Sequence, residues 1–175
     1  MEEVKKALNI FAKGVVMQSK RNLTQQGKKA SSALHRSIKY ELDVYKNSFS
    51  LSFLMENYGQ FVDQGVKGKR SSSKAPRSPF RFGSGRGKKG GLTKGIDKWV
   101  RRKGIQFRDR RTGRYLSYKS TAFLITRSIY NKGIAPSLFF TKPFENAFKR
   151  LPNEVVEKFG LEVDELIQHA LKDFK

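Results

Sequence analysis

The chain has 175 residues, and its 37 Lys and Arg residues against 15 Asp and Glu residues give a formal net charge of +22. This length fits one domain, and a hydrophobic content of 37% with 12% aromatic residues suffices for a packed core, which excludes a wholly disordered chain. The absence of cysteine excludes disulfides and thiolate metal sites, and the longest apolar run, Ala122–Ile125, is far shorter than the ~20 residues that span a bilayer.

The first part of the chain predicts two helices followed by a β-hairpin. Apolar residues recur at helical spacing over residues 3–26, with Gly27 as a stop, and a second short helix is expected over residues 29–37. The spacing then changes to alternation over residues 38–44 and 49–55, with a short polar turn between them. Two alternating runs of this kind are typical of an antiparallel hairpin with one buried face.

A short helix over residues 57–64 is followed by a segment of different composition. Residues 66–92 are rich in Gly, Ser, Pro, Lys and Arg and have no apolar periodicity. Such a segment buries too little apolar surface to offset its ordering entropy. We therefore expect a long basic loop that is mobile in the free protein.

Three further helices are predicted after this loop. Thr93 is an acceptable N-cap for a helix over residues 94–103, and a helix over residues 120–132, with Phe123 available for burial, ends at Gly133. Between these two helices, an Arg-rich turn joins two short apolar runs, which predicts a second hairpin. A proline at position 143 fits the first turn of the third helix.

The expected fold class is α+β, in a single domain of residues 1–175. It comprises a long N-terminal helix, an antiparallel β-hairpin packed by several helices, the basic loop of residues 66–92 and a C-terminal helix. Residues 153–175 form an amphipathic helical extension of this domain.

The sequence offers no compact set of catalytic or metal-binding residues. The two histidines fall on separate predicted helices, and no Gly-Lys-Ser/Thr phosphate loop is present. Metal-dependent phosphoryl chemistry needs two or three carboxylates that converge on one ion. We therefore expect a protein without catalytic activity, metal or cofactor. The carboxylates that a nuclease would have to use are Glu41, Asp43, Glu56, Asp63, Asp97 and Asp109.

The positive charge is concentrated in the middle of the chain. Residues 66–119 hold 19 Lys or Arg residues and two acids, whereas residues 145–175 hold seven acids and five bases. This asymmetry favours a localised surface for a polyanion or an acidic protein over general solubility. No base-reading motif accompanies it, so contact with nucleic acid should be independent of sequence. The candidate residues for nucleic-acid or partner binding are Lys67, Lys69, Arg70, Lys74, Arg77, Arg81, Arg86, Lys88, Lys89, Arg110, Arg111 and Arg114.

Aromatic residues interleave with these bases. We expect Trp99, Phe107 and Tyr115 in the hydrophobic core, whereas Phe80 and Phe82 lie inside the loop and are expected to anchor it.

The motifs also occur in a characteristic order over residues 4–150. The long helix is followed by Ser32–Ile38, the hairpin and the sequence Tyr58-Gly-Gln-Phe-Val-Asp-Gln-Gly65. The basic Gly/Pro loop, the Trp99 helix and a helix ending in Lys-Gly-Ile134 come next, ahead of Pro136 and Phe139-Phe140. In this order the chain resembles the tail-completion proteins of tailed bacteriophages, also called head–tail joining or neck proteins. The long loop and the extension after Pro152 depart from that pattern and leave the neck layer open.

The resemblance implies a non-enzymatic structural virion protein. It would form a homo-oligomeric ring, a connector that joins head to tail around the DNA channel. Its partners would be portal or adaptor proteins and tail proteins, with non-specific contact to double-stranded DNA and no membrane. It would reside in the virion neck, and in the host cytoplasm during assembly. The residues expected at the fold or interface are Tyr58, Phe61, Trp99, Phe139 and Phe140.

Two alternatives from other classes remain open. A sequence-independent nucleic-acid-binding protein of nucleoid or ribosomal type would use the same basic segment directly. The third reading is a nuclease, which metal-dependent cleavage would favour, whereas a ring formed without nucleic acid favours the structural reading.

Overall fold

The structure is a computed structural model of the 175-residue chain. It has the α+β fold class predicted from the sequence, with a long N-terminal helix and a two-stranded antiparallel sheet. The ranges that it describes are residues 2–27, 32–46, 48–84, 90–153 and 155–156.

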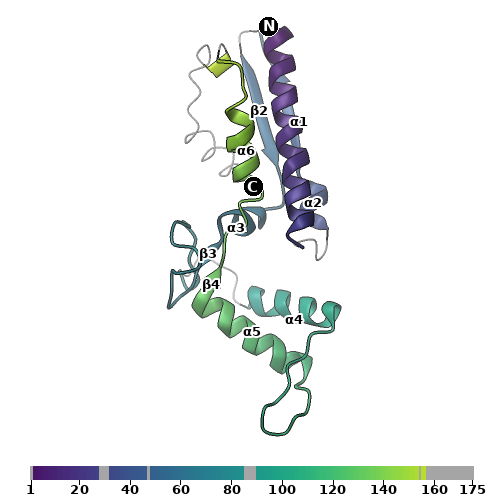
Figure 1. Ribbon diagram of the computed structural model, residues 1–175, viewed down its shortest axis with the longest axis vertical. Helices are drawn as coiled ribbons and strands as arrows, with labels where there is room; N and C mark the ends of the chain where they lie inside the picture. The colour runs from purple at the N-terminus through teal and green to yellow at the C-terminus, as the bar shows by residue number, and fades with distance from the viewer. Residues whose placement is uncertain (1, 28–31, 47, 85–89, 154, 157–175) are drawn as a thin grey trace. The chain divides into compact units, whose positions relative to one another are not determined.

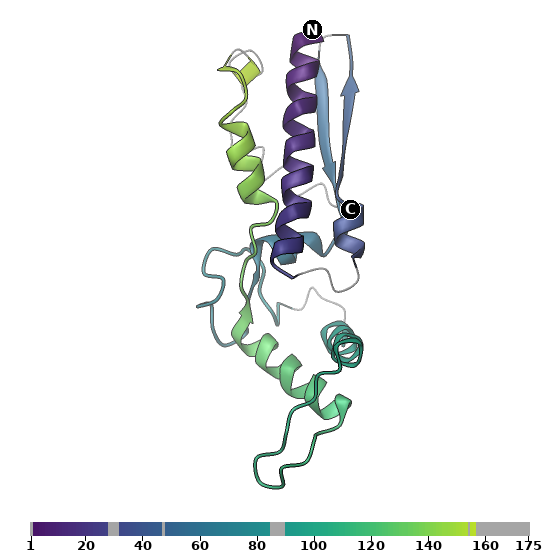
Figure 2. The same cartoon turned by 45° about the vertical axis from the view of Figure 1, so that its right-hand side comes forward.

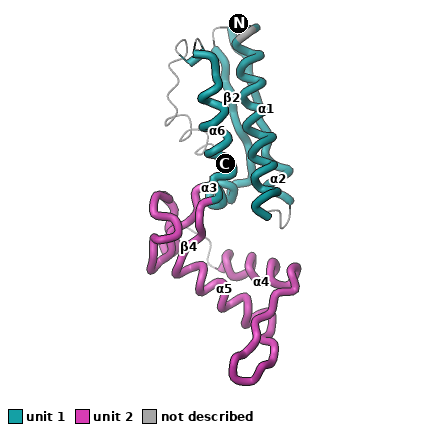
Figure 3. Tube along the Cα trace, viewed as in Figure 1, with its two compact units in different colours: residues 1–63, 137–175 teal, residues 64–136 magenta. Residues whose placement is uncertain are grey.

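The chain divides into two compact units (Figure 3). Unit 1 consists of residues 1–63 and 137–175, and unit 2 consists of residues 64–136. The sequence predicts one domain, and the structure groups its residues into these two units. The grouping arises because residues 64–136 form a strand pair and a helix pair of their own.

Unit 1 is built around a long helix and a hairpin. In Figures 1 and 2 the helix α1 runs alongside the hairpin, and it also contacts α6. The described elements of this unit are α1 (Glu2–Gln25), α2 (Ala33–Ser37), β1 (Lys39–Val44), β2 (Phe49–Leu54), α3 (Gly59–Gln64, which ends at the unit boundary) and α6 (Thr141–Phe148).

The strands β1 and β2 form the antiparallel hairpin that the alternation predicts. Tyr40 lies opposite Phe53 and Leu42 lies opposite Leu51. These side chains pack on or belong to the hydrophobic core, whereas Glu41 on the intervening position is exposed. Because side chains alternate between the two faces of a strand, one face of the hairpin supplies the core and the other meets solvent.

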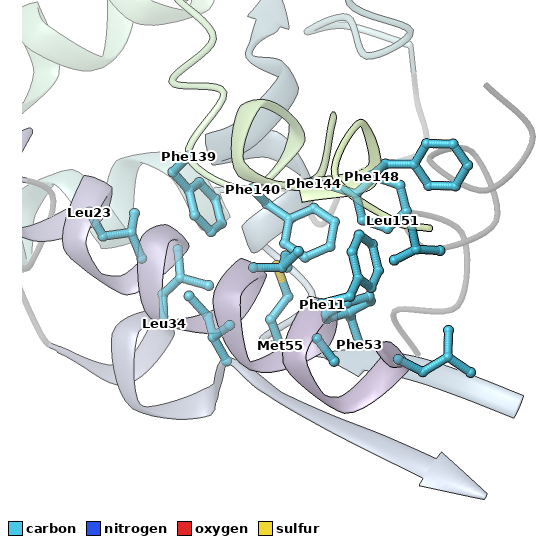
Figure 4. Packing of buried hydrophobic residues seen from close by; sticks show 14 of the residues in the cluster. Phe11, Leu23, Leu34, Phe53, Met55, Phe139, Phe140, Phe144, Phe148 and Leu151 are labelled. Atoms are coloured by element: carbon cyan, nitrogen blue, oxygen red, sulfur yellow. The ribbon is translucent and has the colours of Figure 1, made fainter. Parts of the chain in front are cut away.

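Phenylalanine rings hold the core of unit 1 together (Figure 4). The Phe53 ring centroid lies 5.3 Å from that of Phe140 and 5.9 Å from that of Phe144. Phe11 of α1 lies 5.3 Å from Phe144 in an edge-to-face arrangement. This geometry favours attraction between ring edge and ring face, so the core joins α1, the hairpin and α6.

Unit 2 contains a short strand pair and two packed helices. Its described elements are β3 (Val66–Lys67), α4 (Gly91–Lys103), α5 (Tyr118–Lys132) and β4 (Gly133–Ile134). The helix α4 begins at Gly91 after Gly90, so the predicted N-cap at Thr93 is wrong. Ser117 accepts a hydrogen bond from the Ser120 N–H, which starts α5 two residues earlier than predicted.

The predicted extension over residues 153–175 is described only to residue 156, and its remainder lies outside the described residues. Within the described ranges, no helix combines the length and apolarity needed to cross a membrane.

Candidate basic interface in unit 2

Unit 2 carries most of the charge of the protein. Its residues 64–136 include 21 Lys or Arg residues and two acids, which gives a net charge of +19 out of +22. The rest of the chain is close to neutral by comparison, so the surface that favours a polyanion belongs to this unit.

Residues 66–84 have more structure than the sequence predicts. The Lys67 N–H donates to the Phe80 carbonyl at 2.8 Å, and the Phe82 N–H donates to the Lys67 carbonyl at 2.9 Å. The Lys69 N–H donates to the Tyr130 carbonyl at 2.8 Å. The interpretation of residues 66–92 as a segment without structure of its own is therefore wrong for these residues, because their backbone groups pair with one another and with α5.

Glycine serves close backbone packing in this segment. A Cβ atom at Gly68 would lie 2.1 Å from the Asn131 carbonyl oxygen, and one at Gly133 would lie 2.3 Å from the Val66 carbonyl oxygen. Only glycine allows two backbones to approach so closely. These two glycines are explained by the fold rather than by contact with nucleic acid.

Two side chains anchor the segment from within. Ser78 is buried, and its hydroxyl donates to the Gly65 carbonyl at 2.8 Å. The Phe82 ring packs 5.8 Å from the Tyr130 ring, and the Lys69 ammonium lies 6.0 Å from the centroid of the same tyrosine. The anchoring role predicted for Phe82 is thus met by a contact with α5.

The predicted basic residues fall into three groups. Lys67, Lys69, Arg70, Lys74, Arg77 and Arg81 lie on the packed segment 66–84, with Lys67 half-buried and the other five exposed. Arg110, Arg111 and Arg114 lie on the connection between α4 and α5 and are all exposed. The predicted residues Arg86, Lys88 and Lys89 lie outside the described residues.

The connection between α4 and α5 is a narrow two-stranded ribbon, which we call the tip (residues 105–116). The Leu116 N–H donates to the Phe107 carbonyl at 2.8 Å, and Arg108 and Tyr115 form an antiparallel bridge. In Figure 1 the tip extends beyond the ends of both helices. The second hairpin predicted between these helices is present in this reduced form.

Two of the three aromatic residues expected in the core are exposed. Phe107 and Tyr115 lie on the tip, and their exposed fractions are 40% and 62%. The Arg108 guanidinium covers the Tyr115 ring at 4.6 Å from its centroid. Phe123 on α5 is 57% exposed, and Trp99 on α4 is half-buried. The core prediction is therefore wrong for Phe107 and Tyr115, and Phe123, which the sequence made available for burial, is mostly exposed.

Asp109 organises the turn of the tip. Its carboxylate accepts hydrogen bonds from the N–H groups of Thr112 at 2.8 Å and Arg111 at 2.9 Å, and from the Thr112 hydroxyl at 3.1 Å. These bonds, led by the Thr112 N–H, stabilise the charged form and lower the pKa of Asp109. Gly113, at a φ of 68°, completes the turn.

The other acid of unit 2 is also held locally. Asp97 forms an ion pair with Arg101 one turn along α4, at 3.0 Å. Asp97 and Asp109 are the two acids of unit 2, and both are engaged within it. Because they stand against 21 Lys or Arg residues, most of the positive charge of the unit is not neutralised within it.

The segment Tyr58–Gly65, on which the family resemblance partly rests, contains a buried carboxylate. Asp63 is fully buried, and its carboxylate accepts hydrogen bonds from the Phe140 N–H at 2.8 Å and from the N–H and hydroxyl of Thr141. The Ser137 N–H donates to the backbone carbonyls of Val62 and Asp63. A buried carboxylate with this many donors is a fold element. Sequence reasoning placed Asp63 among possible metal ligands and also within the segment Tyr58–Gly65 on which the family resemblance rests.

The five residues expected at the fold or interface have different settings. Phe139 and Phe140 are fully buried in the core of unit 1, so any role for them is in the fold and not on a surface. Tyr58 and Phe61 are 41% and 43% exposed. The described residues contain no group of three or more His, Asp or Glu side chains placed to hold a metal ion.

Comparisons of the chain with protein-family models, with curated proteins and with solved structures give no match.

Proposed function

We propose that this chain is a non-enzymatic structural virion protein of the phage neck type. It forms a ring that joins the portal or adaptor to the tail around the DNA channel. The observation that carries the proposal is the buried carboxylate within the segment Tyr58–Gly65, on which the family resemblance partly rests. The buried carboxylate of Asp63 ties residues 58–65 to the start of α6, across 77 positions of sequence. Residues that the family resemblance singles out thus support the fold rather than a reaction.

Charge distribution supports a place beside DNA. A net charge of +19 on unit 2 suits a channel through which a polyanion passes, and such a channel gains nothing from reading sequence. The near-neutral remainder of the chain leaves unit 1 suited to protein contacts, because like-charge repulsion between neighbouring copies is smaller there.

Exposed apolar residues on unit 1 support assembly. Ile10 and Met17 on α1 are 74% and 65% exposed, and they lie seven positions apart on one face of the helix. Gly14 between them leaves open space where a side chain would stand. Protein contacts commonly bury such side chains.

The proposal is tested in the phage that encodes the chain. Removing the gene should leave DNA-filled heads and complete tails that remain unjoined, and supplying the protein should restore joined particles. Joined, infective particles in the absence of the protein would rule out the neck role.

The second candidate is a sequence-independent nucleic-acid-binding protein, which the same charge on unit 2 favours. It differs from the first in predicting no ring in the absence of nucleic acid. The two are separated by examining nuclease-treated protein for rings.

A further inference from the structure

We infer that the tip, residues 105–116, is a preorganised site for the phosphate backbone of duplex DNA, and that the packed segment 66–84 is not. This goes beyond the proposed function and does not depend on it, because it concerns the free chain and DNA alone.

The tip carries a concentration of exposed positive charge. Arg108, Arg110, Arg111 and Arg114 are all exposed, and the only acid among them, Asp109, turns its carboxylate to the backbone of the turn. Among the described residues, no acidic side chain pairs with Arg110, Arg111 or Arg114. Arginine binds phosphate through two parallel N–H···O bonds, so these three guanidinium groups suit a phosphate backbone.

The turn of the tip is held by hydrogen bonds in the free chain. The Asp109 N–H donates to the Arg114 carbonyl at 2.9 Å, and the Gly113 N–H donates to the Asp109 carbonyl at 2.9 Å. With the carboxylate bonds to Thr112 and Arg111, five hydrogen bonds fix the turn that presents the arginines. A fixed turn loses little conformational entropy on binding, which is the main benefit of preorganisation.

The shape of the tip also suits duplex DNA. The tip is a two-stranded ribbon that extends beyond α4 and α5 (Figure 2). A two-stranded ribbon fits the major groove of duplex DNA, about 12 Å wide, where it can reach the phosphates on both sides. The Gln106 amide donates to the Leu116 carbonyl, so it is occupied within the tip.

The segment 66–84 is ordered as well, but its bases are placed differently. Its backbone packs against α5 through Lys69, and its own Ser78 is buried. It carries six Lys or Arg residues and no acid, whereas the tip carries four Arg residues and one Asp. Lys67 is half-buried and the Lys69 ammonium lies 6.0 Å from the centroid of the Tyr130 ring, so these bases are partly engaged within unit 2 and should contribute mainly long-range attraction.

An anionic membrane surface is the competing ligand for a basic, aromatic tip. The Arg108 guanidinium lies over the Tyr115 ring and donates to its hydroxyl at 3.1 Å. One face of this ring is therefore covered by a cation, and the turn of residues 108–114 carries four arginines and no apolar side chain to insert among lipids. We assign the tip to DNA, and the test includes vesicles as an outcome.

The experiment measures the affinity of the full chain for a short fluorescent duplex between about 0.05 and 0.3 M salt. The tip variant carries Arg110→Ala, Arg111→Ala and Arg114→Ala. Its matched control carries three substitutions of the same charge in the same unit, at Arg70, Lys74 and Arg77. All six residues are exposed, and circular dichroism verifies that both variants fold.

The tip variant should lose affinity on the order of 10- to 100-fold at low salt. Its plot of log K against log salt should flatten by about 2–3, since each phosphate contact contributes about 0.9. The control should lose less than about threefold, with a slope change below about 1. Equal losses in the two variants would overturn the inference in favour of diffuse attraction. Loss of binding to vesicles of anionic lipid with DNA binding intact would overturn it in favour of a membrane.

A second pair of variants separates preorganisation from charge. Both Asp109→Ala and Asp109→Asn raise the net charge by one, so charge alone predicts tighter binding for each. Asparagine keeps an oxygen that can accept the turn hydrogen bonds, whereas alanine does not. We expect Asp109→Asn to bind as tightly as the original chain or more tightly, and Asp109→Ala to bind several-fold more weakly. Equal tightening by both would show that the fixed turn contributes nothing and would overturn the preorganised site.

Discussion

Asp63 links two segments of unit 1 that are far apart in the sequence. It is fully buried and satisfies three donors at the start of α6. Asp63→Ala leaves those donors unpaired, which should lower the free energy of unfolding by about 2–4 kcal/mol. Chemical denaturation followed by circular dichroism measures this loss. Asp43→Ala on the exposed face of the hairpin is the matched control, and a loss as large there would contradict the account.

The stability of the turn of the tip should depend on pH through Asp109. Because its hydrogen bonds lower the pKa in the folded chain, the turn contributes stability above the unfolded value of 3.8, and this is lost as pH falls through the lower folded value. Titration by NMR should therefore give a midpoint below 3.8. Thr112→Val removes the hydroxyl donor at 3.1 Å and should raise that midpoint. An unchanged midpoint would contradict the role of the hydroxyl.

Sequence reasoning succeeds where a residue's environment is set by its neighbours in the chain. Gly27 and Gly133 are expected at helix ends, and each has positive φ there. Asp63 and Ser78 have no such local signal, because their partners lie in segments that only the fold brings near. The prediction for Phe107 was wrong because its apolar character can be read from the sequence, whereas its burial depends on which segments the fold places around it.

At the scale of elements, the hairpin and α6 are joined by the core of phenylalanine rings. Phe53→Ala should lower the free energy of unfolding by about 3–5 kcal/mol, because Phe53 meets the rings of Phe11, Phe140 and Phe144. Denaturant unfolding measures the change. Ile10→Ala is the control, since that side chain is 74% exposed, and it should change stability by less than about 0.5 kcal/mol.

The segment 66–84 provides a second test at this scale. The sequence predicts early cleavage by trypsin, whereas the backbone hydrogen bonds of Lys67 and Lys69 predict resistance. Ser78→Ala removes the buried bond to Gly65 and should increase cleavage after Lys74 and Arg77. Peptide mapping after brief digestion measures this. Rapid cleavage of the original chain at these sites would restore the reading of a mobile loop.

The type and order of the elements were predictable, whereas some of their first residues and their grouping were not. The alternation of residues 38–44 and 49–55 was enough to predict the hairpin and its buried face, because side-chain periodicity fixes which face is buried. The division into two units depends on how the strand pair of residues 66–67 and 133–134 closes the second unit. Such a pairing of two-residue strands leaves no periodic signal in the sequence.

At the scale of the whole molecule, net charge governs association. Copies that each carry +22 repel one another at low ionic strength. Salt screens this repulsion, with a Debye length of about 10 Å at 0.1 M. Assembly into a ring should therefore strengthen as salt is raised, whereas binding of DNA should weaken. Opposite salt dependences distinguish protein contacts from DNA-mediated association.

The most direct test of the central claim is the mass of the nuclease-treated full chain as salt is raised from about 0.05 to 0.3 M. We predict a discrete species of many subunits that grows in amount with salt and is seen as a closed ring by electron microscopy. A chain that stays monomeric throughout this range, and also after portal and tail proteins are added, would contradict the account.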